Sequence, residues 1–160
     1  MKRWILLGWM GAVLVFINVS VARKEILLNG GTVMYLRLAP VDPRSLMQGD
    51  YMALNYEMAR KVPSDAPRDG RLVVSVDARH VAEFVRLGEG EAMKEGERLL
   101  RYRIRRKRVK LGAESFFFAE GTAHEYDRAK YGELRVTEEG DSVLVGLADE
   151  NLKRLGPGLK

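Results

Sequence analysis

Pro40-Val-Asp-Pro-Arg-Ser-Leu-Met-Gln-Gly-Asp-Tyr-Met-Ala-Leu-Asn-Tyr56 is the stretch that decides the fold, because it joins two extended segments through a compact turn. Asp42 can cap a short helical turn, since an N-cap aspartate accepts a hydrogen bond from the first free amides. Pro43 then suits the first position of that turn. Gly49 can close the turn in a left-handed conformation, which costs glycine little.

The same stretch continues into a strand. From Tyr51 onward Met52, Leu54 and Tyr56 alternate with more polar residues, which is typical of a strand with one buried face. Similar alternation and intervening turn residues recur along the chain. The predicted strands are residues 32–38, 51–61, 71–77, 81–87, 99–111, 115–119, 134–137 and 142–147, with short helices at 122–129 and 149–155. The sequence therefore predicts a mainly β fold, barrel-like or sandwich-like.

The segment at residues 101–110 is strongly basic. Its apolar positions change parity between Ile104 and Val109, so we expect a bulge or a tight hairpin at residues 105–108. One interpretation is a basic surface for an acidic partner or anionic lipid head groups. The other is an ordinary polar strand face paired with acidic neighbours. The residues proposed for the basic surface are Arg101, Arg103, Arg105 and Lys107.

These features resemble a bacterial family named for its Gly-Asp-Tyr-x-x-Leu-x-Tyr motif. The five named positions of that motif are Gly49, Asp50, Tyr51, Leu54 and Tyr56. Residues 116–121, Phe-Phe-Phe-Ala-Glu-Gly, are similar to the family's aromatic segment, and residues 131–136 and 144–147 to its closing strands. The resemblance covers roughly residues 25–155. It implies a membrane-anchored protein that associates with polytopic membrane proteins, and it implies no activity.

The N-terminal segment predicts a membrane anchor. Residues 4–22 carry no charge, and 19 helical residues reach about 28 Å, close to the thickness of the hydrocarbon core. Lys2 and Arg3 favour a cytoplasmic N-terminus and a domain in the periplasm or outside the cell. The alternative is a signal peptide cleaved after Ala22. We therefore divide the chain into an anchor at 1–24, a β-rich domain at 25–155 and a tail at 156–160.

The composition of the chain excludes several classes of functional site. The chain has 160 residues, an apolar fraction of 46% and a net charge of +5, which fit one globular domain. It has no cysteine, so disulfides, thiol catalysis and cysteine-bound metal are excluded. An exported domain with this charge is not expected to bind nucleic acid. No motif for a metal or a cofactor is present, so neither is expected.

A group of titratable residues at 120–127 is the best candidate for catalysis. Glu120 and His124 are residue types that cooperate in general acid–base chemistry. A strand-to-helix corner stabilised by Glu120 and Gly121 is the plainer explanation, and we prefer it. A membrane-tethered hydrolase using Asp50, Glu120 or His124 is the alternative function.

The preferred hypothesis is therefore a membrane-anchored binding or accessory domain for a polytopic membrane protein, in contact with membrane lipid. The sequence does not indicate its oligomeric state. The candidate binding residues are Asp42, Pro43, Arg44, Gly49, Asp50, Tyr51, Leu54, Tyr56, Glu120 and Gly121.

Overall fold

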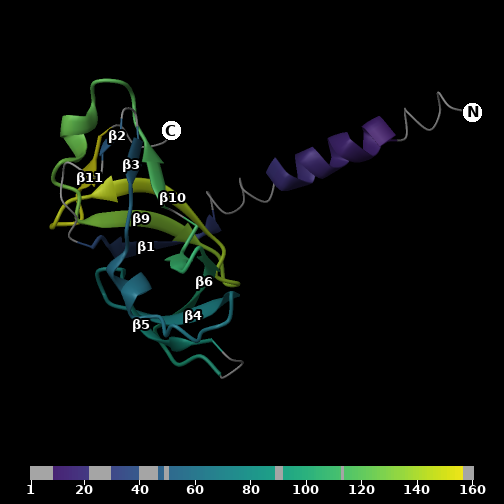
Figure 1. Cartoon of the computed structure of the whole chain (residues 1–160), viewed down its shortest axis with the longest axis horizontal. Helices are drawn as coiled ribbons and strands as arrows, with labels where there is room; N and C mark the ends of the chain where they lie inside the picture. The colour runs from purple at the N-terminus through teal and green to yellow at the C-terminus, as the bar shows by residue number, and fades with distance from the viewer. Residues whose placement is uncertain are drawn as a thin grey trace, which may run out of the picture.

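The computed structural model of the chain describes residues 9–21, 30–39, 47–48, 51–88, 92–112 and 114–156. Its main element is an eight-stranded sheet with the order β11-β10-β9-β1-β5-β4-β6-β7. A smaller sheet, β2-β3-β8, packs against it (Figure 1). The bounds of the strands are β1 Thr32–Arg37, β2 Met47–Gln48, β3 Tyr51–Ala53, β4 Asp69–Val76, β5 Val81–Leu87, β6 Glu97–Arg105, β7 Arg108–Lys110, β8 Ser115–Phe117, β9 Tyr131–Val136, β10 Ser142–Ala148 and β11 Arg154–Leu155. The mainly β prediction is confirmed.

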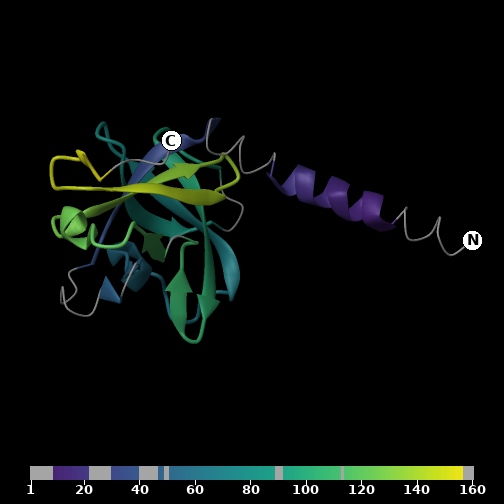
Figure 2. The same ribbon diagram turned by 90° about the horizontal axis from the view of Figure 1, so that it is seen from above.

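The large sheet curves around one hydrophobic core. Leu72 and Leu100 from β4 and β6 lie in the same buried cluster as Leu134 and Leu147 from β9 and β10. Seen from above, the two halves of the sheet wrap toward each other (Figure 2). Among the described strands no pairing joins β11 to β7, so the sheet stays open rather than closing into a barrel.

Strand β1 holds the centre of this sheet. It pairs antiparallel with β9 from Thr32↔Val136 to Arg37↔Tyr131, and parallel with β5 at Tyr35↔Val81. Met34 and Leu36 are fully buried, as their alternation predicts. The strands predicted at 134–137 and 142–147 are confirmed as β9 and β10, which pair antiparallel with a bulge between Leu144 and Gly146.

A hairpin turn explains why the apolar positions of the basic segment change parity between Ile104 and Val109. β6 and β7 pair antiparallel down to Arg105↔Arg108, which leaves a two-residue loop. Arg106 and Lys107 in this loop have φ of 49° and 61°, the signature of a type I′ turn. The predicted tight hairpin at residues 105–108 is therefore confirmed.

Two predicted elements are wrong. The strand expected over 51–61 ends at Ala53, and Glu57–Arg60 forms a 3-10 helix, η1. The helix expected over 149–155 is a turn followed by β11, because Asp149 captures the amides of Asn151 and Lys153 with its carboxylate. The helix expected over 122–129 is shorter, a 3-10 turn at Ala123–Tyr126, η2.

Residues 9–21 form a helix that stands away from the sheets (Figure 1). Every residue in it is exposed, including the large side chains of Trp9 at 72% and Phe16 at 73%. Within the described part of the chain, no helix combines the length and the apolar character needed to cross a membrane.

Candidate binding site

The motif strand β3 presents two different faces. Met52 points inward, is 3% exposed and pairs with Phe116 of β8. Tyr51, one residue earlier, lies on the opposite face, directly across from Phe117. The two rings are 5.8 Å apart between centroids and tilted by 39°. Phe117 is 73% exposed, so an aromatic pair lies at the surface beside the motif, and we call it the Tyr51–Phe117 face.

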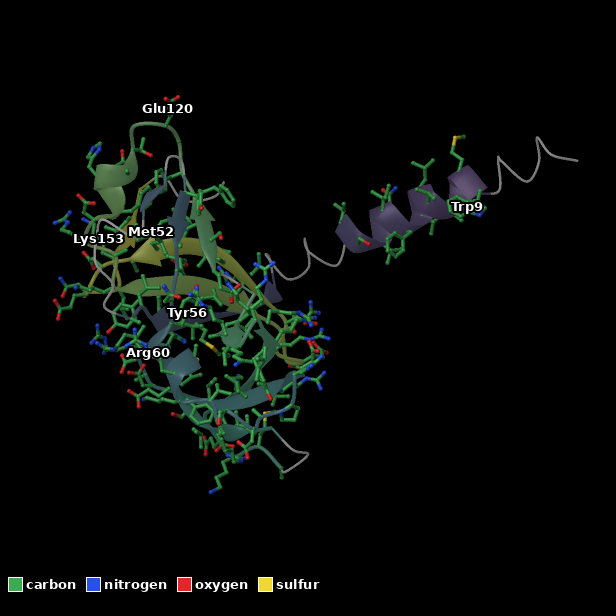
Figure 3. The ribbon with its side chains drawn as sticks, viewed as in Figure 1. Trp9, Met52, Tyr56, Arg60, Glu120 and Lys153 are labelled. Atoms are coloured by element: carbon green, nitrogen blue, oxygen red, sulfur yellow. The ribbon has the colours of Figure 1, made fainter. Side chains whose placement is uncertain are left out.

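The second motif tyrosine is structural. Tyr56 is 3% exposed, and its ring lies in the core (Figure 3). Burial raises the pKa of Tyr56 well above its ordinary value, and the nearby carboxylate of Glu114 raises it further. The phenol therefore stays neutral at physiological pH, which suits packing and hydrogen bonding rather than nucleophilic chemistry.

A pocket of about 1040 Å³ opens between η1 and the β6–β7 hairpin. Its floor is apolar and includes the motif residues Leu54 and Tyr56, both 3% exposed, together with Val62. Ile104 and Val109 pair with each other across the hairpin and line the pocket from the hairpin side. The strand pairing of β6 and β7 thus brings the basic hairpin against the end of the motif.

The rim of this pocket is basic. Its seven cationic residues are Arg60, Arg68, Arg105, Arg106, Lys107, Arg108 and Lys110. Glu114 is the one acidic residue in the lining that the structure describes. The Oε1 atom of Glu114 accepts hydrogen bonds from the amides of Leu111 and Gly112, so this carboxylate holds the turn after β7. The pocket therefore carries a large excess of positive charge.

Part of the predicted basic surface is paired with acids. Arg101 lies 2.9 Å from Asp141, and Asp69 lies 3.4 Å from Arg103 and 3.9 Å from Arg105. All of these side chains are about half exposed, so each pair contributes little to stability. Lys107 has no ion pair with any residue in the described ranges. Arg105 and Lys107 line the pocket, whereas Arg101 and Arg103 do not.

Glu120, Gly121 and His124 form an exposed corner between β8 and η2. Glu120 projects from the tip of this loop, far from Tyr56 and Arg60 (Figure 3). Gly121 has φ of 79°, and its carbonyl accepts a hydrogen bond from Nδ1 of His124 at 3.2 Å. Glu120 makes no hydrogen bond with the residues that the structure describes, so the predicted stabilisation of the corner by its carboxylate is not seen there. Neither Glu120 nor His124 lines the pocket.

The other predicted site residues lie outside the described residues. They are Asp42, Pro43, Arg44, Gly49 and Asp50. Sequence reasoning missed Phe117 as a surface residue, although strand alternation in 115–119 would have placed it opposite Phe116. It also missed the cations from η1 and the loop after it, Arg60 and Arg68, because only the folded chain brings them to the hairpin.

Comparison with known proteins gives one match. The model of the family described as GDYXXLXY protein matches residues 13–147. No curated protein and no solved structure matches the chain.

Proposed function

Because this chain belongs to the GDYXXLXY family, we propose that it is a membrane-anchored, extracytoplasmic binding subunit that docks on a polytopic membrane protein. The docking surface in this proposal is the Tyr51–Phe117 face. The chain would bind rather than catalyse, holding its partner at the outer side of the cytoplasmic membrane.

The exposure of Phe117 carries this proposal. A phenylalanine that is 73% exposed on a three-residue strand buries little of its ring in the fold. Exposed aromatic residues that are paired and rigid are enriched in protein interfaces, where they bury large areas at small entropic cost. Tyr51 lies beside Phe117 with its ring tilted against it, and Tyr51 belongs to the motif that defines the family. A binding surface explains both the exposure and the position.

The N-terminal helix supports the anchoring part of the proposal. Its exposed apolar side chains surround it, and a helix that is apolar all round is typical of a membrane or a protein interior. The uncharged run extends beyond the helix to cover residues 4–22, about 28 Å as a helix. Lys2 and Arg3 precede it, which favours an extracytoplasmic C-terminal domain.

The test of docking is purification of the tagged full chain from its native membranes in mild detergent, followed by mass spectrometry. We expect a polytopic membrane protein in stoichiometric amount. Phe117→Ser should release it without unfolding the domain, because the ring is mostly in solvent. Val85→Ser is the matched control, since Val85 is an exposed apolar residue of β5, away from the motif.

Two results would overturn the docking proposal. One is recovery of the intact chain alone after crosslinking in the native membrane. The other is retention of the partner by Phe117→Ser, or equal loss in Val85→Ser.

The topology has its own test, which the absence of cysteine makes simple. Single cysteines at Lys153→Cys and Lys2→Cys are labelled with a thiol reagent that does not cross membranes. We expect labelling at position 153 in intact spheroplasts and at position 2 only after lysis. Labelling of position 153 only after lysis would refute the extracytoplasmic location, and loss of position 2 from the mature chain would establish the cleaved alternative.

A further inference from the structure

We infer that the pocket between η1 and the β6–β7 hairpin binds a phosphate-bearing amphiphile, with the phosphate on the basic rim and the apolar part on the floor. This inference goes beyond the proposed function, because it assigns a small ligand to a pocket that Phe117 does not line. Either binding event can exist without the other.

The charge of the pocket is the first argument. Seven cationic residues and one carboxylate line it, and among the described residues only Arg105 of the seven has an acidic partner within 4.0 Å. Two pairs of like charges also lie directly opposite each other across the hairpin, Arg105↔Arg108 and Arg103↔Lys110. Like charges in directly opposed positions destabilise a strand pair. Asp69 lies 3.4 Å from Arg103 and 3.9 Å from Arg105 and offsets part of this repulsion. An anion in the pocket offsets the remainder at Arg105↔Arg108, because both of these residues line it.

The turn of the hairpin is the second argument. Arg106 and Lys107 occupy the two positive-φ positions, where asparagine and glycine are strongly preferred. The chain therefore accepts a conformational cost to place two cations at the rim. Departures from local preference of this kind are expected where function requires a particular side chain.

The number of arginines identifies the anionic group. Five of the seven cations are arginine, which offers planar forks of donors that match phosphate oxygens in pairs. A phosphate monoester carries up to two negative charges and three terminal oxygens, so it can engage several guanidinium groups at once. It satisfies this rim better than a single carboxylate does.

The floor identifies the rest of the ligand. Ile104 and Val109 are only partly buried and offer carbon rather than hydrogen-bonding groups, with buried Leu54 and Val62 beneath them. An inorganic ion would leave Ile104 and Val109 in contact with water. The volume is at the upper end of small-molecule sites, which are roughly 300–1,000 Å³. An apolar group attached to the phosphate fills this space and adds affinity through burial.

The test uses the full chain in phosphatidylcholine nanodiscs and isothermal titration calorimetry. The probe is 1-naphthyl phosphate, a soluble phosphate monoester with an apolar ring system, and inorganic phosphate is the comparison. We expect saturable binding of the naphthyl ester, about tenfold or more tighter than that of inorganic phosphate. Equal affinity for the two would overturn the role of the floor, and no binding of the ester would overturn the proposal.

The decisive variant is Arg106→Asn/Lys107→Gly. It removes two rim charges while giving the turn its preferred residues, so the hairpin is kept. We expect the affinity for 1-naphthyl phosphate to fall about tenfold or more, the loss of one or more charge-assisted contacts. Arg128→Gln/Lys153→Gln removes the same net charge from exposed positions outside the pocket and should leave affinity unchanged. Equal weakening in both variants would mean nonspecific attraction and would refute the site.

A second comparison distinguishes the source of the phosphate. Titration is repeated in nanodiscs that contain phosphatidylglycerol, at a salt concentration that screens the field of the bilayer. Competition that weakens the naphthyl ester in the native chain supports a lipid head group as the occupant, and unchanged affinity supports a soluble ester. If a poly-glutamate peptide binds the pocket while 1-naphthyl phosphate does not, the occupant is an acidic protein segment and the inferred ligand class is wrong.

Discussion

The ring of Tyr56 lies directly on Gly132 of β9. A Cβ at position 132 would be 2.9 Å from the tyrosine hydroxyl and 3.0 Å from Cε1, closer than side chains tolerate. The motif tyrosine therefore fits only where the facing strand has no side chain. The same relationship occurs between Tyr102 and its cross-strand partner Gly70, where a Cβ would lie 2.8 Å from Cε1. In both places an aromatic ring covers the backbone that a glycine leaves bare.

Gly132→Ala should destabilise the domain by about 1–3 kcal/mol, because the added methyl group displaces a ring in a packed core. Urea unfolding of the detergent-solubilised full chain, followed by circular dichroism, measures this change. Gly11→Ala is the control, since no atom lies within 4 Å of a Cβ there, and it should leave the unfolding of the β domain unchanged. An unaltered midpoint in Gly132→Ala would show that Tyr56 moves aside freely.

The hairpin turn predicts a variant that is more stable than the native chain. Arg106→Asn/Lys107→Gly should raise stability by about 0.5–1 kcal/mol, because both positions have positive φ. Arg106→Val/Lys107→Val removes the same charges but places β-branched residues at positive φ, so it should lower stability. Thermal unfolding of the two variants separates conformation from charge. A rise in stability for both would mean that charge repulsion dominates the turn, and a fall for both would contradict the expected gain from backbone preference.

Glu97 predicts how stability changes in acid. Its carboxylate accepts two hydrogen bonds from Arg86, at 2.7 and 3.0 Å, and one from the amide of Lys94 at 2.9 Å. The bonds from Arg86, followed by that of the Lys94 amide, lower the pKa of Glu97 from 4.5 to about 2. The folded state therefore holds this proton less tightly than the unfolded state. Its stabilising contribution is complete above pH 4.5 and is lost as the pH falls toward 2.

Urea unfolding at a series of pH values checks this expectation. Glu97→Gln should have a flatter dependence than the native chain between pH 4.5 and 2. Glu150→Gln, at an exposed turn, is the control and should keep the native slope. An identical slope in the native chain and Glu97→Gln would contradict the predicted linkage.

Glu133 and Arg154 form a second carboxylate–guanidinium pair. Nε of Arg154 donates to Oε2 of Glu133 at 2.8 Å, and Nη2 donates to Oε1. The Glu133 side chain is only 6% exposed, so Arg154→Met leaves a buried carboxylate without its partner and should cost about 2–4 kcal/mol. Glu133→Leu/Arg154→Met removes both charges and should recover most of that loss, as measured by urea unfolding. A double variant as unstable as the single one would show that packing, not the unpaired charge, is responsible.

Local patterns in the sequence were sufficient to predict many strands of the sheet. The alternation of Met34 and Leu36 gave the buried face of β1, and the parity change between Ile104 and Val109 located the hairpin. The errors came where polar side chains override propensity. Residues 149–155 have helical composition, but the Asp149 carboxylate binds two amides and makes a turn instead.

The candidate site was harder to predict from the sequence. Tyr51 was proposed from the motif, but its neighbour Phe117 is 66 positions later in the chain and meets it only through the pairing of β3 with β8. The pocket likewise needs η1 and the β6–β7 hairpin side by side. Both arrangements depend on long-range pairing, which no local pattern encodes. The pairing of Arg101 and Arg103 with acidic neighbours was predicted in general terms, but their partners Asp141 and Asp69 were not.

The central place of β1 sets the order in which the chain can fold. Of the strands that the structure describes, β1 is synthesised first, yet its antiparallel partner β9 is about a hundred residues behind it, at Thr32↔Val136. Until Tyr131–Val136 emerges, one edge of this central strand lacks its neighbour in the sheet. Sheets that depend on such distant strand pairs fold slowly. Their unpaired strand edges are prone to aggregation until pairing is complete. Biosynthesis of this domain therefore includes an interval in which the unpaired edge of β1 is a target for chaperone binding.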